Sequence, residues 1–327
     1  MDARTWCPAR GAPDALRERL RQTILARMAI FGSPDLAIDL GTATTRLAGG
    51  QQGICDRPSA GQSRRALACG VIVDPEAAIE VLRPMLRQRR QTTLKRPRVL
   101  ACAPTDVTAA ERRAVETCIM EAGASSVLIV PEPLAAAVGA GIDIGCRYAK
   151  FLVDFGDGVT DCAVIRDGQM IASLAARVGC GDLRRTVQNF VFTATRTSIS
   201  DDEADRILRK VGVTGQHDEH GFGVNGSSEV RFRVPVEELQ AELWPVIDRM
   251  LDPIKALLKN LPSAVGAEVI EDGIFLTGGG ALLPGMCEIV ATESDIETRI
   301  VRDPLSAVIK GACKMLPFAA TLKLWEE

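Results

Sequence analysis

Along most of the chain, short runs of apolar residues alternate with longer segments in which apolar residues recur every three or four positions. The short runs predict buried strands, and the periodic segments predict amphipathic helices. Strands are predicted at 36–40, 45–48, 98–103, 127–130, 151–154, 161–166, 169–175, 229–235, 274–276 and 297–301. Helices are predicted at 75–90, 108–122, 133–141, 182–196, 201–211, 235–259, 284–293 and 304–315. This alternation indicates an α/β fold in which helices cover sheets.

Local residue choices support some of these boundaries. Thr108 and Glu111 have the spacing of a capping box at the start of a helix. Pro133 suits the first position of another helix, where its missing N–H costs nothing. Residues 50–66 are polar, residues 212–228 are rich in glycine, and neither segment shows a period, so both are interpreted as loops.

The segment before the first strand has a different character. Residues 1–14 are interpreted as a loose tail, and residues 15–31 predict a basic amphipathic helix. A second basic segment, residues 83–98, holds seven lysines and arginines and no acid. Together these segments predict binding to an anionic membrane surface. The alternative is a helix that packs on its own lobe beside a solvated loop. The residues predicted to face the membrane are Leu16, Leu20, Ile24, Met28 and Phe31.

Composition narrows the class of protein. A chain of 327 residues suggests two lobes. A net charge of −3 and only 4% aromatic residues argue against a nucleic-acid partner. The ten cysteines include no C-x-x-C pair, which favours buried thiols in a reducing cytoplasm over a metal or redox motif. The absence of a long apolar run and of a signal peptide fits the same cytoplasmic location.

The sequence gives little support for a histidine metal site or for catalysis by histidine. The only two histidines, His217 and His220, flank two acids in the glycine-rich segment. This cluster favours a solvated loop over a metal site, and it leaves no Ser-His-Asp or Cys-His arrangement.

Two motifs of the same design carry the clearest chemical signal. In each, an apolar strand ends in an aspartate, Asp39 or Asp154, and is followed by glycine and threonine in a tight turn and then by another strand. The aspartates are 115 residues apart (154 − 39). Glycine lets the backbone approach a phosphate, and successive N–H groups form an anion-binding nest. The aspartate carboxylates are suited to bind the water molecules around a Mg²⁺ ion that the phosphates also bind. The alternative is two purely structural hairpins.

A third motif follows the predicted strand at 274–276. Thr277 is succeeded by three glycines, Gly278 to Gly280, and a predicted helix starts shortly after. Because glycine has no side chain, a flat ring or a ribose can lie directly against this backbone, close to a helix N-terminus. The alternative is a flexible turn.

Taken in order, the three motifs resemble the superfamily of actin, heat-shock chaperones and sugar kinases. Within it the chain resembles the MreB/Mbl family of bacterial actin homologues over about residues 30–316. The segments that carry the resemblance include Asp35-Leu-Ala-Ile-Asp-Leu-Gly-Thr-Ala, Arg98-Val-Leu-Ala-Cys-Ala-Pro, Glu132-Pro-Leu-Ala-Ala-Ala-Val-Gly-Ala-Gly-Ile and Thr277-Gly-Gly-Gly-Ala-Leu-Leu. The resemblance implies actin-like duplicated RNase H-like lobes with a central nucleotide cleft, ATP and Mg²⁺ as ligands, and filaments at the inner membrane that serve cell shape and cell-wall synthesis.

The resemblance also implies site residues and domain limits. It places Glu132 where the family positions the attacking water, although the residue alone would also fit an acid at a helix start. Residues 1–34 would form the tail and amphipathic helix, 35–145 the first lobe, 146–303 the second and 317–327 a C-terminal tail, with a closing helix at about 304–316 returning to the first lobe. The implied nucleotide-binding residues are Asp39, Gly41, Thr42, Thr44, Asp154, Gly156, Asp157, Gly158, Thr160, Gly278, Gly279 and Gly280, with Asp39 and Asp154 holding Mg²⁺ through water.

The chain departs from the family in three places. Only residues 59–70 stand where the family has a small subdomain, conventionally called IB. Asp157 replaces a usual glycine. Leu208, Arg209 and Lys210 stand where a lysine and a glutamate normally meet the base and ribose. The short segment at 59–70 argues against polymerisation of the protein by itself. Asp157 need not abolish nucleotide binding, whereas the changes at Leu208, Arg209 and Lys210 predict altered or weaker binding.

Three functional hypotheses follow. The first is a cytoskeletal element that assembles with itself or with a full-length MreB paralogue and acts with the cell-wall synthesis machinery. The second is a monomeric ATPase or kinase-like enzyme, although no sugar-binding signature accompanies it, and ATP hydrolysis itself is left open. The third is an adaptor that keeps the fold and has lost the nucleotide.

Overall fold

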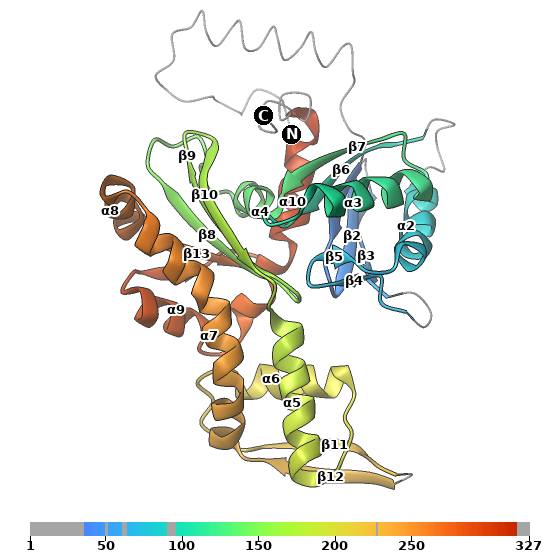
Figure 1. Ribbon diagram of the computed structural model, residues 1–327, viewed down its shortest axis with the longest axis vertical. Coiled ribbons are helices and arrows are strands. Elements are labelled where there is room, and N and C mark those ends of the chain that lie inside the picture. The colour runs from blue at the N-terminus through green and yellow to red at the C-terminus, as the bar shows by residue number, and fades with distance from the viewer. Residues whose placement is uncertain (1–35, 50–51, 61–63, 90–95, 227, 319–327) are drawn as a thin grey trace, which may run out of the picture.

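Two five-stranded sheets form the centres of two lobes in the computed structural model, which describes residues 36–49, 52–60, 64–89, 96–226 and 228–318 (Figure 1). The first sheet has the order β3-β2-β1-β6-β7 and the second β10-β9-β8-β13-β14. The first is built from β1 (Leu36–Leu40), β2 (Thr44–Gly49), β3 (Gln52–Pro58), β6 (Arg98–Ala103) and β7 (Ser126–Pro131). The second is built from β8 (Lys150–Phe155), β9 (Thr160–Arg166), β10 (Gln169–Ala176), β13 (Ile274–Thr277) and β14 (Thr298–Ile300).

The two sheets share one topology. In each, three consecutive strands pair antiparallel, a later strand pairs parallel with the first of them, and a final strand pairs parallel with that later strand. Since β1 and β8 are flanked on both sides, β1 is buried along its whole length and β8 is buried from Phe151 to Phe155, which is why both strands are mostly apolar. The lobes are therefore duplicates, as the paired motifs predict.

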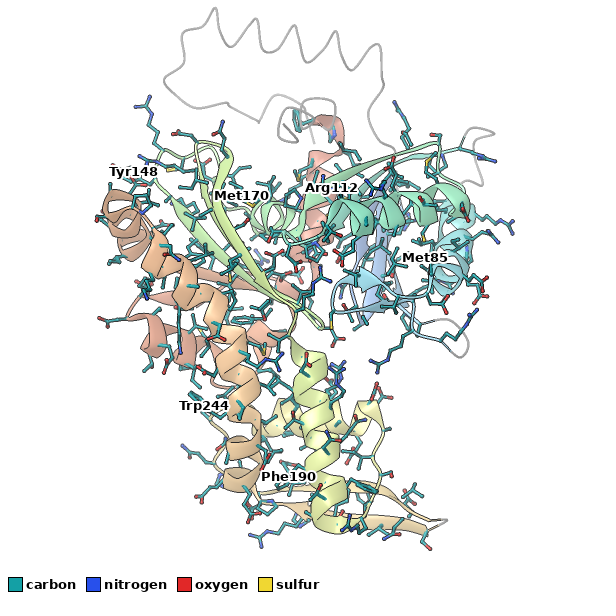
Figure 2. The ribbon with its side chains drawn as sticks, viewed as in Figure 1. Met85, Arg112, Tyr148, Met170, Phe190 and Trp244 are labelled. Atoms are coloured by element: carbon teal, nitrogen blue, oxygen red, sulfur yellow. The ribbon has the colours of Figure 1, made fainter. Side chains whose placement is uncertain are left out.

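Helices cover both faces of each sheet. In the first lobe, α2 (Pro75–Arg89) and α3 (Ala109–Ala122) pack on the outer face, and Met85 of α2 is fully buried there (Figure 2). The predicted capping box of Thr108 and Glu111 is present at the start of α3. The outer face of the second sheet carries α5 (Cys180–Thr195), α7 (Val236–Asn260), α8 (Ser263–Asp272) and α9 (Met286–Ser294).

The inner faces of the two sheets share a pair of helices, α4 (Glu132–Ala140) and α10 (Ala307–Met315). One apolar cluster joins residues of both helices to residues of both sheets. The helices cross so closely that a Cβ on Gly311 would lie 1.7 Å from the Ala135 carbonyl oxygen. A Cβ on Gly139 would lie 1.8 Å from the Ala307 oxygen. Glycine is therefore required at the crossing, which brings the last helix against the first lobe.

The small appendages of the lobes differ in size. The second lobe carries α6 (Asp201–Val211) and the hairpin of β11 (Glu219–Asn225) and β12 (Ser228–Val234), which form the lower part of Figure 1 together with α5 and the start of α7. Between β3 and α2, the first lobe has a hairpin of β4 (Leu67–Ala68) and β5 (Val71–Ile72).

Two loop predictions were wrong. Residues 50–66 are not all loop, because β3 pairs with β2 as an edge strand whose polar side chains stay in solvent. Residues 212–228 are not all loop either, because β11 pairs with β12. Glycine suits β11 since a Cβ on Gly221 would lie 2.3 Å from the Phe232 ring. The helix α8 was not predicted. The predicted closing helix starts as a short 3-10 turn, Pro304–Ser306.

Other predictions fall on residues outside the described ranges. The helix predicted at 15–31 is one of them, with its membrane-facing residues Leu16, Leu20, Ile24, Met28 and Phe31. Most of the tail at 317–327 is another. Within the described ranges, the cysteines are free thiols and none is exposed. None of the helices there is long and apolar enough to span a lipid bilayer.

Candidate functional site

A cavity of about 350 Å³ opens between the two lobes, and both predicted hairpins line it. The predicted residues that line it are Asp39, Gly41, Thr42, Thr44, Glu132, Asp154, Gly156, Asp157, Gly158, Gly278 and Gly279. Two predicted residues do not face the cavity. The Thr160 hydroxyl is buried and donates to the Val178 carbonyl at 3.0 Å, and Gly280 packs against Phe155. They support the walls of the site.

The two hairpins have the same local geometry. A Cβ on Gly41 would lie 2.8 Å from the Thr44 carbonyl oxygen, and a Cβ on Gly156 would lie 2.8 Å from the Val159 oxygen. A side chain at either position would therefore collide with its own turn. This requirement explains why the Asp-x-Gly signal occurs once in each lobe.

The hairpins also contact each other. A Cβ on Gly158 would lie 2.5 Å from the Thr42 hydroxyl oxygen and 2.8 Å from the Cys69 Cα. The Thr42 hydroxyl accepts a hydrogen bond from the Gly70 N–H at 2.9 Å and keeps its proton to donate. The turn between β4 and β5 thus closes one side of the cavity. Sequence reasoning missed Gly70, whose only signal is its place in a Cys-Gly turn.

Buried carboxyl groups concentrate at the floor of the cavity. Asp39 is 5% exposed and Asp154 is 7% exposed. Burial raises the pKa of Asp39 to about 6, with Arg46 opposing and Asp154 adding to the shift. Burial also raises the pKa of Glu132 well above its usual range, and the charges of Asp39 and Asp154 add to this. The pKa of Asp154 rises for the same reason, although the Thr277 hydroxyl donates to its carboxylate at 2.7 Å. Such a floor favours cations.

One cation, Arg46, stands among these acids and was not predicted. Its Nη1 lies 3.2 Å from Asp39 Oδ2, and its Nε lies 3.8 Å from Asp56 Oδ2. The three residues face one another across β1, β2 and β3. At the corresponding place in the second lobe, Asp161 stands opposite Asp154. Arg46 and Asp161 each lie seven residues after the motif aspartate of their lobe, and this equal spacing is a signal in the sequence that could have identified them.

The carboxylates of Asp39 and Asp154 fit a Mg²⁺ ion that takes most of its ligands from outside the protein. Carboxylate oxygens are the hard ligands that Mg²⁺ prefers. Within the described ranges, however, no three histidine, cysteine or acidic side chains converge closely enough to hold a metal by themselves. Asp39 and Asp154 therefore fit an ion whose remaining ligands are waters and phosphates. The acids beside His217 and His220 are engaged elsewhere, since Asp218 pairs with Arg233 and Glu219 with Arg206.

The opposite end of the cavity combines aliphatic and charged side chains. Leu208 and Arg209 of α6 line it, as their places in the motif comparison suggested, whereas Lys210 is exposed and does not. Sequence reasoning missed two other residues there. Arg184 of α5 lies 2.6 Å from Asp157 Oδ1 and 3.9 Å from Asp205 Oδ1. The charged groups at this end already satisfy one another.

A separate set of polar contacts joins the lobes beside the second hairpin. Arg177 lies 2.7 Å from Asp106 and 2.8 Å from Glu111 of the first lobe. Asp161 accepts hydrogen bonds from the Thr105 N–H at 2.8 Å and from its hydroxyl at 2.6 Å. Burial raises the pKa of Asp161 to about 7 even though Thr105 opposes the shift.

The interlobe ion pair predicts an acid dependence of stability. Hydrogen bonds from Arg177, and next from the Thr108 backbone, lower the pKa of Glu111 from 4.5 to about 2. A carboxyl whose pKa is lower in the folded chain stabilises the fold above its unfolded pKa, and this contribution is lost as the pH falls. Urea unfolding between pH 4.5 and 2 should show a shallower decline for Glu111→Gln than for wild type. The exposed Glu116→Gln on the same helix should match wild type, and equal slopes in all three proteins would contradict the assignment.

Known proteins of one family match most of this chain. The family model described as MreB/Mbl protein matches residues 58–323. The cell shape-determining protein MreB of Escherichia coli K12 is 29% identical over 324 residues, covering 87% of this chain and 93% of the relative. The cell shape-determining protein Mbl of Bacillus subtilis strain 168 is 28% identical over 261 residues, covering 77% and 78%.

Solved structures match the fold. The crystal structure of MreB 5 of Spiroplasma citri bound to AMPPNP has a TM-score of 0.79 at 24% identity, covering 89% of this chain and 98% of that one. The MamK double helical filament has a TM-score of 0.74 at 17% identity, covering 86% and 98%. With its two duplicated lobes, its paired hairpins and a family match across most of its length, the chain has the actin-like fold and belongs to the MreB/Mbl family.

Proposed function

We propose that the interlobe cavity binds ATP with Mg²⁺ and that the protein is a cytoskeletal element of cell shape. One observation carries the nucleotide proposal: two hairpins of equal geometry face each other across one cavity, above the acidic floor of Asp39 and Asp154. Backbone N–H groups from both turns can then surround one phosphate chain. The nucleotides named for two of the related structures support the same ligand class.

Different residues of the cavity are proposed to contact different parts of the nucleotide. Thr42 can donate its hydroxyl proton to a phosphate oxygen, and Arg46 offers a guanidinium that lines the cavity beside Asp39. Gly278 and Gly279 leave room for the ribose and base beside Leu208 and Leu305. Asp39 and Asp154 would hold Mg²⁺ through water, and that ion would neutralise phosphate charge and favour the ionised form of the floor carboxyls.

Glu132 is proposed to orient a water molecule. It is the first residue of α4 and lines the cavity beside both aspartates. Burial and the charges of Asp39 and Asp154 raise the pKa of Glu132 and so favour its protonated form. Orienting an attacking water requires the ionised form, which a Mg²⁺ ion bound nearby would favour.

Assembly and location complete the proposal. The filament named for one related structure supports self-association or co-assembly with a full-length MreB paralogue. We place the protein in the cytoplasm at the inner face of the membrane, beside the cell-wall synthesis machinery. The exposed Arg83 and Arg87 on the solvent side of α2 support attraction to anionic lipid.

A second candidate is an adaptor that no longer needs nucleotide. The specific observation in its favour is the network of Arg184, Asp157, Asp205 and Arg209, whose charges pair with one another without a ligand. A ribose would have to compete with these pairs.

Titration with a fluorescent ATP analogue in the presence of Mg²⁺ tests the proposal. Wild type should bind with micromolar affinity, and Asp154→Ala should bind at least about tenfold more weakly because the floor loses its ion-holding carboxylate. Asp252→Ala, which removes an exposed acid from α7, serves as the control and should match wild type. Absence of binding by wild type would reject the ATP assignment and leave the adaptor.

A further inference from the structure

A second cavity, of about 370 Å³, lies between the loop that follows α4 and the edge strand β14. We call it the α4–β14 pocket, defined by Ile142, Lys150, Phe275, Arg299 and Arg302 among its lining residues. It shares no lining residue with the interlobe cavity. The nucleotide proposal leaves it without a role.

The charge around this pocket is mainly positive. Lys150 lies 2.8 Å from Asp272, and Arg299 stacks on the Phe275 ring at 4.8 Å while donating to the Asp272 carbonyl. Arg302 is exposed and forms no hydrogen bond or ion pair with any residue of the described ranges, although its charge helps to lower the pKa of the neighbouring Asp303. The one acid in the lining, Asp143, accepts a hydrogen bond from the Gly145 N–H at 3.2 Å. The Arg302 guanidinium thus keeps its hydrogen-bond donors available in a lining that also holds two cations engaged elsewhere, Lys150 and Arg299.

The floor of the same pocket is apolar. Ile142 and Phe275 are half-buried side chains at the fringe of the central cluster. Ile300 of β14 is 39% exposed beside them. A ligand that suits both parts must combine a negative charge with an adjoining apolar group, because either group alone would leave half of the lining unused.

We propose that the α4–β14 pocket binds an acidic segment of a partner protein, with a glutamate or aspartate on Arg302 and a neighbouring apolar side chain against Phe275 and Ile300. A planar carboxylate matches the fork of a guanidinium. The edge position of β14 lets an extended peptide approach alongside the pocket.

A membrane surface fits the same positive charge less well. Electrostatic attraction to lipid acts on cations that project from a broad surface. The Lys150 side chain is only 14% exposed and is recessed in the pocket. A side chain entering from a peptide can reach it, and a flat layer of headgroups cannot.

Fluorescence anisotropy with capped, labelled peptides tests the proposal on the full chain. The probes place one central glutamate between two leucines, two isoleucines or two phenylalanines, and matched peptides carry glutamine in place of the glutamate. At least one acidic peptide should bind wild type, and both its glutamine counterpart and the Arg302→Gln protein should bind at least about tenfold more weakly. Arg249→Gln, an exposed arginine on α7, should match wild type.

Three results would overturn the proposal. They are equal binding by wild type and Arg302→Gln, failure of every acidic peptide to bind, and displacement of the peptide by phosphatidylglycerol vesicles from wild type and Arg249→Gln alike, with direct vesicle binding weakened only in Arg302→Gln. The last result would assign the site to lipid. Nucleotide binding by Arg302→Gln, measured in parallel, separates this proposal from the function proposed for the interlobe cavity.

Discussion

Gly311→Ala is expected to destabilise the protein by about 3 kcal/mol or more, although it adds a single methyl group. That methyl carbon would lie 1.7 Å from the Ala135 carbonyl oxygen and 2.8 Å from the Gly139 nitrogen. Both atoms belong to the backbone of α4, so no side-chain rotation can relieve the overlap. The helices would have to separate, and the apolar cluster that joins the two sheets would open with them.

Gly266→Ala provides a matched control within a helix of the same protein. Nothing lies within 4 Å of a Cβ built at Gly266. Because alanine favours helix over glycine, this change should stabilise the protein by roughly 0.5–1 kcal/mol. Urea unfolding followed by circular dichroism measures both variants. Equal midpoints for Gly311→Ala and wild type would show that the crossing is looser than described.

Arg46→Gln is expected to weaken nucleotide binding at least about tenfold. The substitution removes a guanidinium that lines the cavity and leaves Asp39 without its ion-pair partner. Because Arg46 lowers the pKa of Asp39, its loss should raise that pKa further above about 6. Part of the affinity should therefore return at higher pH, where Asp39 ionises and can again help to hold Mg²⁺.

The measurement is a titration with the fluorescent ATP analogue at several pH values. Arg57→Gln is the control, since Arg57 is an exposed residue of the neighbouring strand β3. Wild-type affinity in Arg46→Gln would mean that the phosphates lie away from this side chain. Equal losses in both variants would indicate a general effect of charge instead of a contact.

The parts of the site that sequence could predict are those in which chemistry and local geometry coincide. Asp39 and Asp154 each lie one residue before the end of a buried strand and two residues before a glycine whose turn admits no side chain, so the signal is local and occurs twice. Thr160 satisfies the same pattern, yet it turns inward and bonds Val178. A pattern along the chain does not say which of two hydroxyls faces the cavity.

The parts that could not be predicted depend on contacts between distant segments. The place of Arg46 in the site depends on the strand register that sets it opposite Asp39 and Asp56, and the sequence alone does not give that register. Arg184 and Asp205 meet only because α5 and α6 pack side by side. In the same way, β3 has few apolar residues of its own and is a strand because β2 supplies its hydrogen-bond partners.

The close crossing of α4 and α10 also limits how the molecule can deform. Two backbones in contact at one point cannot slide past each other, but they can rotate about that point. The crossing is therefore expected to act as a pivot, with each lobe as a lever arm whose far end moves most. Distances between spin labels at the lobe ends should then vary with ligand, while distances across the crossing stay constant. A small rotation at two glycines would thereby become a large change in the distance between the far ends of the two lobes.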